Sequence, residues 1–253
     1  MAVGSCSRMR SPARTVQASV CILLLAVWCA IALAAETGCP QHFADGIAPD
    51  LLNPKLAINA REICYTGFAV MYSGATRTPI YTAEYLNRER LLLAKGVKRH
   101  NRFHPDGNIP KEQRAELQHY ANSGYDRGHM APSADMPDEQ AQYESFSLAN
   151  IVPQNPANNR GAWAKLEALV RRLAKDQGRL YVITGPVFES GTVRQIGGAV
   201  RIPDKLFKVV LISDSVSARA FIVENGETAG VSEIALDALE TMTGLRLFPQ
   251  GMQ

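Results

Sequence analysis

The sequence contains no internal repeat, no low-complexity tract, no linker rich in proline, glycine or serine, and no Gly-x-Ser-x-Gly motif. The missing motif argues against acyl-transfer chemistry on a serine nucleophile. With 46% hydrophobic and 20% charged residues, the composition is that of an ordinary soluble globular protein, which excludes wholesale disorder. A chain of 253 residues is long enough for one large domain, and we expect a single domain over residues 36–253.

Acidic residues are absent before Glu36. All the charge in residues 1–35 comes from three arginines, Arg8, Arg10 and Arg14. From Val20 to Ala35 the chain is uncharged and almost wholly apolar, and it ends in small residues. This pattern predicts a secretory signal peptide over residues 1–35, with export to the periplasm or the medium. Two alternatives are an uncleaved membrane anchor and a mitochondrial transit peptide, although transit peptides are amphipathic and this stretch is not.

Cysteine is scarce beyond this leader. Of the five cysteines, Cys6, Cys21 and Cys29 lie within the leader, which leaves only Cys39 and Cys64. An even pair in an exported protein predicts one disulfide, which would close an N-terminal loop. The alternative is two unpaired buried thiols.

The net charge of +3 comes from the three arginines of the leader. The whole chain has 27 basic residues, and without the three leader arginines the remaining 24 equal the 24 acidic residues. Attraction for polyanions must therefore come from local clustering. Between Arg77 and His104 the basic residues are Arg77, Arg88, Arg90, Lys95, Lys98, Arg99 and Arg102, opposed only by Glu84 and Glu89. Such a segment can hold phosphates, although it can equally be a solvated surface.

The order of apolar patterns predicts an α+β fold with a mixed, largely antiparallel sheet flanked by helices, because short turns join several strands. Expected strands are Ile63–Tyr72, Ile80–Leu86, Ser145–Val152, Leu180–Val187, Leu206–Ser213 and Ala218–Glu224. Expected helices are Lys111–Tyr120, Gly161–Lys175 and Val231–Thr241, the last closed by Gly244 as a C-cap. We expect residues 36–60 to be irregular, a basic loop to run up to Pro110, and Gly185-Pro186 to break its strand.

The stretch YDRGHMAPSADM, residues 125–136, concentrates reactive side chains. His129 has an unperturbed pKa near neutrality, which suits it to take a proton from water. Arg127 presents a planar fork of donors that fits a phosphate, and Asp126 can orient a neighbour. Gly128 leaves room for a large group to approach the backbone. These residues suit phosphoryl chemistry, whereas the alternative is a surface turn with a coincidental histidine.

A second stretch, NIVPQNPANNRGAWAKLE, covers residues 150–167 and enters the clearest helix. Asn159 precedes Glu167 by eight residues, which in an α-helix means about 12 Å along the axis and about 80° around it. Two side chains so placed can share an ion if one binds it directly and the other holds a metal-bound water, an arrangement that Mg²⁺ favours. Arg171 can contact phosphate or pair with Glu167 across one turn.

With both stretches, the chain resembles the DNA/RNA non-specific endonucleases, the ββα-metal nuclease family that includes secreted bacterial nucleases and mitochondrial endonuclease G. The similarity covers most of the chain beyond the leader. Weaker similarity extends to the segments FAVMYS, FHPDGNIP, VITGPVF and TGLRLFP. The resemblance implies an α+β fold with a ββα-metal catalytic core. It also implies a metal-dependent endonuclease that cuts DNA, RNA or both without sequence preference and leaves 5′-phosphates.

The resemblance also implies roles for individual residues. His129 is similar to the general base that activates water, and Asn159 to the one direct protein ligand of Mg²⁺, for which Mn²⁺ can substitute. Glu167 would hold the water shell of the metal. Arg127 and Arg171 would contact the phosphate. The remaining two positions are supporting ones, Asn150 at the site and Asp126 in its loop.

Other functions remain open on the sequence alone. A protein of the same fold could bind nucleic acid without cutting it, and an exported metal-dependent phosphohydrolase would use similar residues. A zinc site at His100 and His104 is disfavoured, because Pro105 makes that stretch a loop and a third ligand with suitable spacing is missing. The expected partner is DNA or RNA, and no motif indicates an inhibitor protein or an oligomeric state.

Overall fold

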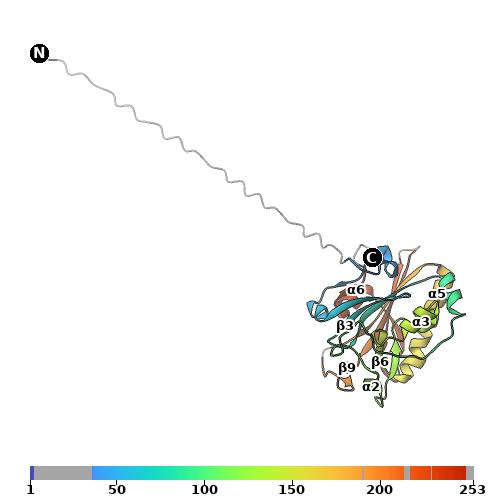
Figure 1. Ribbon diagram of the computed structural model, residues 1–253. Coiled ribbons are helices and arrows are strands. Elements are labelled where there is room, and N and C mark those ends of the chain that lie inside the picture. The colour runs from blue at the N-terminus through green and yellow to red at the C-terminus, as the bar shows by residue number, and fades with distance from the viewer. Residues whose placement is uncertain (3–35, 190, 214–216, 229, 249–253) are drawn as a thin grey trace. The chain divides into compact units, whose positions relative to one another are not determined.

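The computed structural model describes residues 1–2, 36–189, 191–213, 217–228 and 230–248. By its internal contacts the chain divides into two units, Met1–Leu33 and Ala34–Gln253. Nearly all of the predicted leader lies outside the described residues, so it stays a prediction, and the second unit is the one described below (Figure 1). Within the described residues, no helix is long and apolar enough to cross a membrane.

The centre of the fold is a seven-stranded antiparallel sheet with the order β12-β11-β10-β7-β4-β3-β2. Its strands are β2 (Ala60–Cys64), β3 (Ala69–Ser73), β4 (Thr78–Leu86), β7 (Leu180–Val187), β10 (Lys205–Ile212), β11 (Ser217–Glu224) and β12 (Val231–Ile234). Every ladder in this sheet is antiparallel. The predicted α+β class with a largely antiparallel sheet is confirmed.

Among the described residues, three short ladders and six α-helices lie outside this sheet. The ladders pair β5 (Asp126–His129) with β6 (Ile151–Gln154), β1 (Asp50–Leu51) with β13 (Leu245–Arg246), and β8 (Gln195–Ile196) with β9 (Val200–Arg201). The helices are α1 (Arg88–Ala94), α2 (Leu117–Tyr120), α3 (Glu139–Ser145), α4 (Pro156–Asn158), α5 (Ala164–Gln177) and α6 (Leu236–Thr243). Short 3₁₀ turns lie at Pro40–His42, Ala44–Gly46, Pro54–Ala57, Ser133–Asp135 and Leu148–Asn150.

Two apolar layers hold the helices to the sheet. On one face, Leu166 and Val170 of α5 are buried against residues of β7 and β10 such as Val182. On the other face, Leu239 of α6 packs with Phe207. Burial of one such side chain contributes about 1.5–3 kcal/mol, so packing of these stripes, more than helix propensity, determines where the helices lie.

Two predicted strands differ in the structure. Ile63–Tyr72 is the hairpin of β2 and β3, because the chain turns where the Tyr65 N–H donates to the Phe68 carbonyl at 2.9 Å. The apolar pattern continues through this turn, and Gly67 is required there since a Cβ would lie 2.7 Å from the Met136 sulfur. Ser145–Val152 is mostly the end of α3 and a 3₁₀ turn, and only Ile151–Gln154 is strand.

Two prolines lie inside strands of the structure, and the strand break expected at Gly185-Pro186 was wrong. Pro153 lies inside β6, and Pro186 lies inside β7, which runs unbroken from Leu180 to Val187. Gly185 is needed in β7 because a Cβ there would lie 2.6 Å from the Ile80 carbonyl oxygen and 2.7 Å from the Phe207 ring. A proline interrupts a strand only where its missing N–H would have faced a partner.

Several helices also begin or end at residues other than those expected from the sequence. The basic segment expected as loop contains α1, whose N-cap Asn87 accepts from the Arg90 N–H at 2.8 Å. Only the last turn of the expected Lys111–Tyr120 helix forms, as α2. The first four residues of the expected Val231–Thr241 helix are β12. Gly244 caps α6 with φ 69°, so this predicted C-cap is confirmed.

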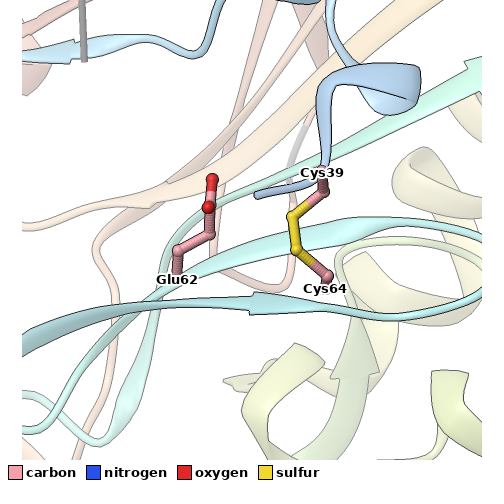
Figure 2. Close-up of side chains that lie close together, drawn as sticks. All are labelled: Cys39, Glu62 and Cys64. Carbon is pink, nitrogen blue, oxygen red and sulfur yellow. A yellow bond between two sulfur atoms is a disulfide. The ribbon is translucent and has the colours of Figure 1, made fainter. Parts of the chain in front are cut away.

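Cys39 and Cys64 form a disulfide, as predicted, with their Cα atoms 5.5 Å apart (Figure 2). The bond joins the irregular N-terminal segment to the end of β2. Glu62 lies beside it and accepts hydrogen bonds from the Thr37 hydroxyl at 2.5 Å and the Gly38 N–H at 2.8 Å. Closing a loop of this length stabilises a fold by about 3 kcal/mol, so we expect the disulfide to hold this segment on the sheet.

Candidate active site

Strand β5 contains the reactive residues of the first motif, YDRGHMAPSADM, and their side chains lie on its two opposite faces. Alternate residues of a strand point to opposite sides, so Arg127 and His129 share one face while Asp126 and Gly128 share the other. A Cβ on Gly128 would lie 2.0 Å from the Gln154 side-chain oxygen. The group that approaches the glycine is therefore the buried Gln154 side chain of the partner strand. The expected close approach of a large group to Gly128 is confirmed, and the group is a side chain of the protein itself.

His129 is enclosed by two aromatic rings. Its ring centroid lies 4.8 Å from that of Phe146, edge to face, and 5.4 Å from that of Phe103. The side chain is 9% exposed, and its Nε2 is buried without a hydrogen-bond partner. Burial lowers the pKa of His129 to about 3, and the nearby charges of Arg99 and Arg127 lower it further in the same direction. The imidazole is therefore neutral near pH 7, so one of its two ring nitrogens carries no proton.

The backbone after His129 is held by Asn150. The Asn150 amide oxygen accepts from the Ala131 N–H at 2.9 Å, and its NH₂ donates to the carbonyls of Ala131 at 2.8 Å and Ser145 at 2.9 Å. The Met130 N–H donates to the Asn150 carbonyl at 3.0 Å. Asn150 is fully buried, so the residue fixes the main chain beside His129 and contacts no solvent-side group.

Asp126 of the first motif forms hydrogen bonds with residues of the second motif, NIVPQNPANNRGAWAKLE. Its carboxylate accepts a hydrogen bond from the Asn159 NH₂ at 2.9 Å and a bidentate pair from Arg160, at 2.9 and 2.7 Å. Burial works against ionisation, but the hydrogen bonds from Arg160 and Asn159 and the charges of Arg160 and Arg127 hold the pKa of Asp126 below its usual value. A carboxylate can only accept, so Asn159 must present its NH₂ to Asp126. The Asn159 Oδ1 is left to face elsewhere.

Asn159 begins a π-helical turn, Asn159–Trp163, between α4 and α5. A π turn accommodates one extra residue, so the eight residues to Glu167 rotate about as far as seven in an α-helix. Counted in this way, Asn159 is about 20° from Glu167 around the axis, whereas a regular α-helix would place it about 80° away. The two side chains share one side of the helix, about 10 Å apart along it.

Glu167 lies among charges on the side of α5 that faces the sheet. Burial raises the pKa of Glu167 to about 7, Lys208 opposes the rise, and the Asp135 carboxylate adds to it. The ion pair of Arg171 is with Asp135, at 3.1 Å, and not with Glu167 across one helical turn. Asp135 belongs to the first motif but was not expected to contribute. It positions Arg171 beside Glu167.

Beneath these residues the sheet carries a buried lysine and glutamate that sequence reasoning also missed. The Lys208 ammonium donates to the Thr184 hydroxyl at 2.6 Å and lies 5.2 Å from the Trp163 ring centroid. Burial, together with the Asp135 charge, raises the pKa of Glu84, whose carboxylate lies 4.0 Å from the Arg90 guanidinium. A lysine in the middle of the apolar strand KLFKVVLI was the available signal, because a buried charge needs partners.

The basic segment does not form one face. Side chains of Arg77, Arg88 and Arg90 bind backbone carbonyls, those of Glu112, Lys175 and Gly67 among them. Arg99 differs, because its guanidinium lies 5.2 Å from the centroid of the Phe146 ring and donates to the Ser133 hydroxyl at 2.8 Å. Arg127 lies 4.2 Å above the Phe103 ring. These two guanidiniums flank His129 through its aromatic neighbours.

The zinc alternative finds no support in the described part of the chain. The His104 ring stacks on Tyr143, with centroids 4.3 Å apart, and its Nδ1 is 2.9 Å from the Arg102 carbonyl. Among the described residues, the one cluster of three histidine, cysteine or acidic ligand atoms is Cys39, Glu62 and Cys64. Its two sulfur atoms are bonded to each other (Figure 2).

Oxygen donors at Asn159 and Glu167 suit a hydrated Mg²⁺ or Mn²⁺ ion. The Asn159 Oδ1 is free of the hydrogen bond that holds its NH₂, and Glu167 supplies a carboxylate on the same side of the helix. Mg²⁺ prefers oxygen ligands and keeps several waters, so one direct ligand and one carboxylate at a distance fit it. These residues therefore fit the expected metal.

Comparisons with known proteins identify the family of the chain. Residues 48–252 match the family described as DNA/RNA non-specific endonuclease. The chain is 36% identical over 218 residues to a protein named nuclease EXOG, mitochondrial, from Xenopus laevis, covering 78% of this chain and 60% of that protein. It is 37% identical to nuclease 1, mitochondrial, from Schizosaccharomyces pombe, covering 63% of this chain and 55% of that protein.

A solved EndoG/EndoGI complex contains a chain that superposes with a TM-score of 0.65 at 26% identity, covering 74% of this chain and 84% of that one. The chain spans about 60% of the length of the curated relatives it matches. The matched region nevertheless includes both motifs, the whole central sheet and α5. The chain belongs to the DNA/RNA non-specific endonuclease family.

Proposed function

We propose that the protein is a metal-dependent endonuclease that hydrolyses phosphodiester bonds of DNA, RNA or both without sequence preference. The observation that carries this proposal is the neutral, buried imidazole of His129, whose Nε2 lacks a partner while Arg99 and Arg127 lie on either side. Family membership and the names of the relatives support the same activity. Contacts to phosphate and metal carry no sequence information, so little base preference should follow.

In the proposed mechanism, His129 Nε2 takes a proton from water, and the resulting hydroxide attacks phosphorus. The aromatic enclosure by Phe103 and Phe146 keeps the ring neutral and in one orientation. Asn150 positions the chain that follows the histidine. General-base catalysis of this kind contributes about 10²–10⁴-fold. The bond to the 3′ oxygen breaks, which leaves a 5′-phosphate on one product. The departing 3′ oxygen takes a proton from solvent and becomes a hydroxyl on the other product, and His129 returns its proton to solvent.

Asn159 would hold Mg²⁺ directly, and Glu167 would hold it through water, with Mn²⁺ as a substitute. The ion would stabilise negative charge on the phosphate and on the departing oxygen. Asp126 would act as a positioning residue, because its hydrogen bond orients the Asn159 amide. Arg127 would contact the phosphate from the strand, and Arg171, oriented by Asp135, from the helix.

The experiment that tests this proposal is incubation of the protein with circular plasmid in Mg²⁺, in Mn²⁺ and in EDTA, beside His129→Ala and Asn159→Ala. Nicking and linearisation in either metal, with loss in EDTA and in both variants, is expected. Unchanged cutting in EDTA would contradict the metal assignment. Full activity of His129→Ala would contradict the base.

The plasmid also separates the alternative functions. A phosphomonoesterase has no terminal phosphate to act on in a closed circle, and a non-cleaving binding protein would retard the plasmid on a gel without nicking it. Treating the cut ends with a polynucleotide ligase then tests for 5′-phosphates, because ligation requires them. Each alternative therefore predicts a different product.

For localisation we propose the mitochondrion, with export as the alternative. Several relatives carry mitochondrial names. The leader lacks acids and contains arginines, as transit peptides do, although its apolar stretch is not amphipathic. The Cys39–Cys64 disulfide favours an oxidising compartment in either case. Fusing residues 1–35 to a fluorescent reporter tests this: mitochondrial import supports the first route, and appearance outside the cell supports the second.

A further inference from the structure

A cavity of about 320 Å³ opens between α1 and α5, beside the proposed active site. Its lining combines an apolar wall, formed by Leu91, Ala94 and Val97, with the cationic side chains of Lys95, Arg99, Arg171 and Lys175. No acidic residue lines it. A concave site with one apolar wall and several positive charges is chemically suited to a nucleotide, which has an apolar base face and a phosphate.

A residue in the wall of the same cavity carries a buried amide. Gln142 of α3 lines it, is 2% exposed, and has an Nε2 with no hydrogen-bond partner. Leaving a buried donor unsatisfied costs about 1–3 kcal/mol, so a partner from outside the chain would stabilise this NH₂. A ligand oxygen in the cavity would satisfy it.

The cavity wall is already formed. The Arg88 Nε donates to the Lys175 carbonyl at 3.0 Å and ties α1 to the end of α5. The Arg99 guanidinium is fixed by Ser133 at 2.8 Å, and that of Arg171 by Asp135 at 3.1 Å. Little ordering is then needed when a ligand binds.

Two residues connect this cavity to the proposed chemistry. Arg99 lies over the Phe146 ring that contacts His129, and Arg171 is a charged neighbour of Glu167. A strand of nucleic acid whose phosphate reaches His129 and Glu167 would therefore pass Arg99 and Arg171 and enter the cavity with its next nucleotide. Lys95 and Lys175 have no part in the proposed catalysis.

We propose that this cavity is a subsite for a nucleotide that flanks the cleaved bond. Lys95 and Lys175 bind its phosphate, the α1 wall packs against its base or sugar, and the Gln142 NH₂ donates to one of its oxygens. The inference rests on the proposed function, because it extends the same active site by one nucleotide.

Binding of a fluorescein-labelled, single-stranded DNA dodecamer, measured by anisotropy over a series of salt concentrations, tests the subsite. The background is His129→Ala in Mg²⁺, so that the DNA stays intact. We expect Lys95→Ala/Lys175→Ala to raise Kd about tenfold and to lower the slope of log Kd against log salt by about 0.7, because the two lysines contact one phosphate and each neutralised phosphate of a single strand contributes about 0.7. The matched control is Lys165→Ala/Arg172→Ala, which removes the same charge from exposed positions of α5 outside the cavity.

Gln142→Leu separates the subsite from general electrostatics, since it keeps the side-chain volume and changes no charge. We expect a several-fold higher Kd with an unchanged or higher unfolding temperature, because the unsatisfied amide is removed. Pocket variants that bind like the control variant would overturn the subsite. Plasmid cutting by wild type that His129→Ala abolishes would, in that event, leave the proposed function intact, so the two ideas fail separately.

Discussion

The two faces of the central sheet differ in what they bury. Toward α6, strands β7 and β10 present Ile183, Phe207 and Val209, which pack with Leu239. Toward α5, the alternate residues of the same strands include Thr184 and Lys208. The first face is an ordinary apolar core.

The face toward α5 buries charged side chains, and this lowers the stability of the fold. Glu84, Asp135 and Lys208 are each 2% exposed or less, and they lie below Glu167 of α5. Burying a charge costs several kcal/mol unless partners offset it, and mutual pairing offsets only part of that cost. The comparison indicates that stability alone shapes the α6 face, whereas the α5 face accepts a less stable arrangement that positions charged groups beside the proposed active site.

The largest expected effect is a loss of nicking rate when the proposed general base is removed. His129→Ala should lower the rate of plasmid nicking by about 10²–10⁴-fold, because the general base is removed. Single-turnover nicking in Mg²⁺ measures it, and circular dichroism checks that the variant is folded. A residual rate within threefold of wild type would remove His129 from the mechanism.

Lys208→Met should destabilise the protein by about 3 kcal/mol, because buried carboxylates lose their nearest compensating charge. Urea unfolding at pH 7 measures the change. The double variant Lys208→Met/Glu84→Gln should recover part of it, since one of the buried carboxyl groups left without Lys208 is then replaced by a neutral amide. No recovery in the double variant would mean that Lys208 acts through packing with Trp163 instead.

Leu239→Ala tests the apolar face. Removing this buried side chain of α6 should cost about 2–5 kcal/mol through lost burial and the cavity left behind. The rate of nicking per folded molecule at 25 °C should not change, because the α6 face carries no proposed catalytic group. A large loss of kcat in a folded variant would show that the two faces are coupled.

The pH dependence of stability should also differ between the faces. Burial first, and then Arg99 and Arg127, lower the pKa of His129 from 6.5 to about 3 in the folded protein. Between these two pH values the unfolded chain binds the extra proton, so the free energy of unfolding rises with pH, by at most about 1.4 kcal/mol per pH unit from this group. The contribution is fully present above pH 6.5 and is lost as the pH falls toward 3. Urea unfolding from pH 4 to pH 7 should show a shallower slope for His129→Phe, and Leu239→Ala should keep the wild-type slope.

The smallest expected effect concerns Arg160. Arg160→Ala should leave the unfolding midpoint nearly unchanged, because this arginine is exposed, but it removes a bidentate partner of Asp126. Asn159 is then less firmly oriented, so the Mg²⁺ concentration for half-maximal nicking should rise a few-fold, below the roughly 10–100-fold typical of groups that orient a ligand directly. Arg172→Ala, also exposed, is the matched control.

Local patterns predicted much of this molecule. The strands at Leu180–Val187 and Leu206–Ser213 were found within one residue, because buried strands form continuous apolar runs. The α5 stripe was visible at its helical period. The hairpin of β2 and β3 was not visible, since its apolar pattern continues through the turn that Gly67 permits.

The candidate site was also predicted only in part. The residue types at positions 129, 159 and 167 indicated a general base and oxygen ligands for a metal, because few side chains can serve in these roles near neutral pH. Their order along the chain could not show that Asp126 orients Asn159, or that Arg171 pairs with Asp135. Those contacts join residues 33 and 36 positions apart.

By itself, the sequence determined the secondary-structure class, the single pair of cysteines outside the leader and the reactive residue types, all of which depend on local propensity and side-chain chemistry. Only the tertiary structure decided the π turn that brings Asn159 to the Glu167 side of its helix, the buried Lys208 and Glu84 beneath that helix, and the free amide of Gln142 in a cationic cavity. The physical reason is that burial, pairing and the lack of a partner are properties of surroundings, and distant parts of the chain supply those surroundings.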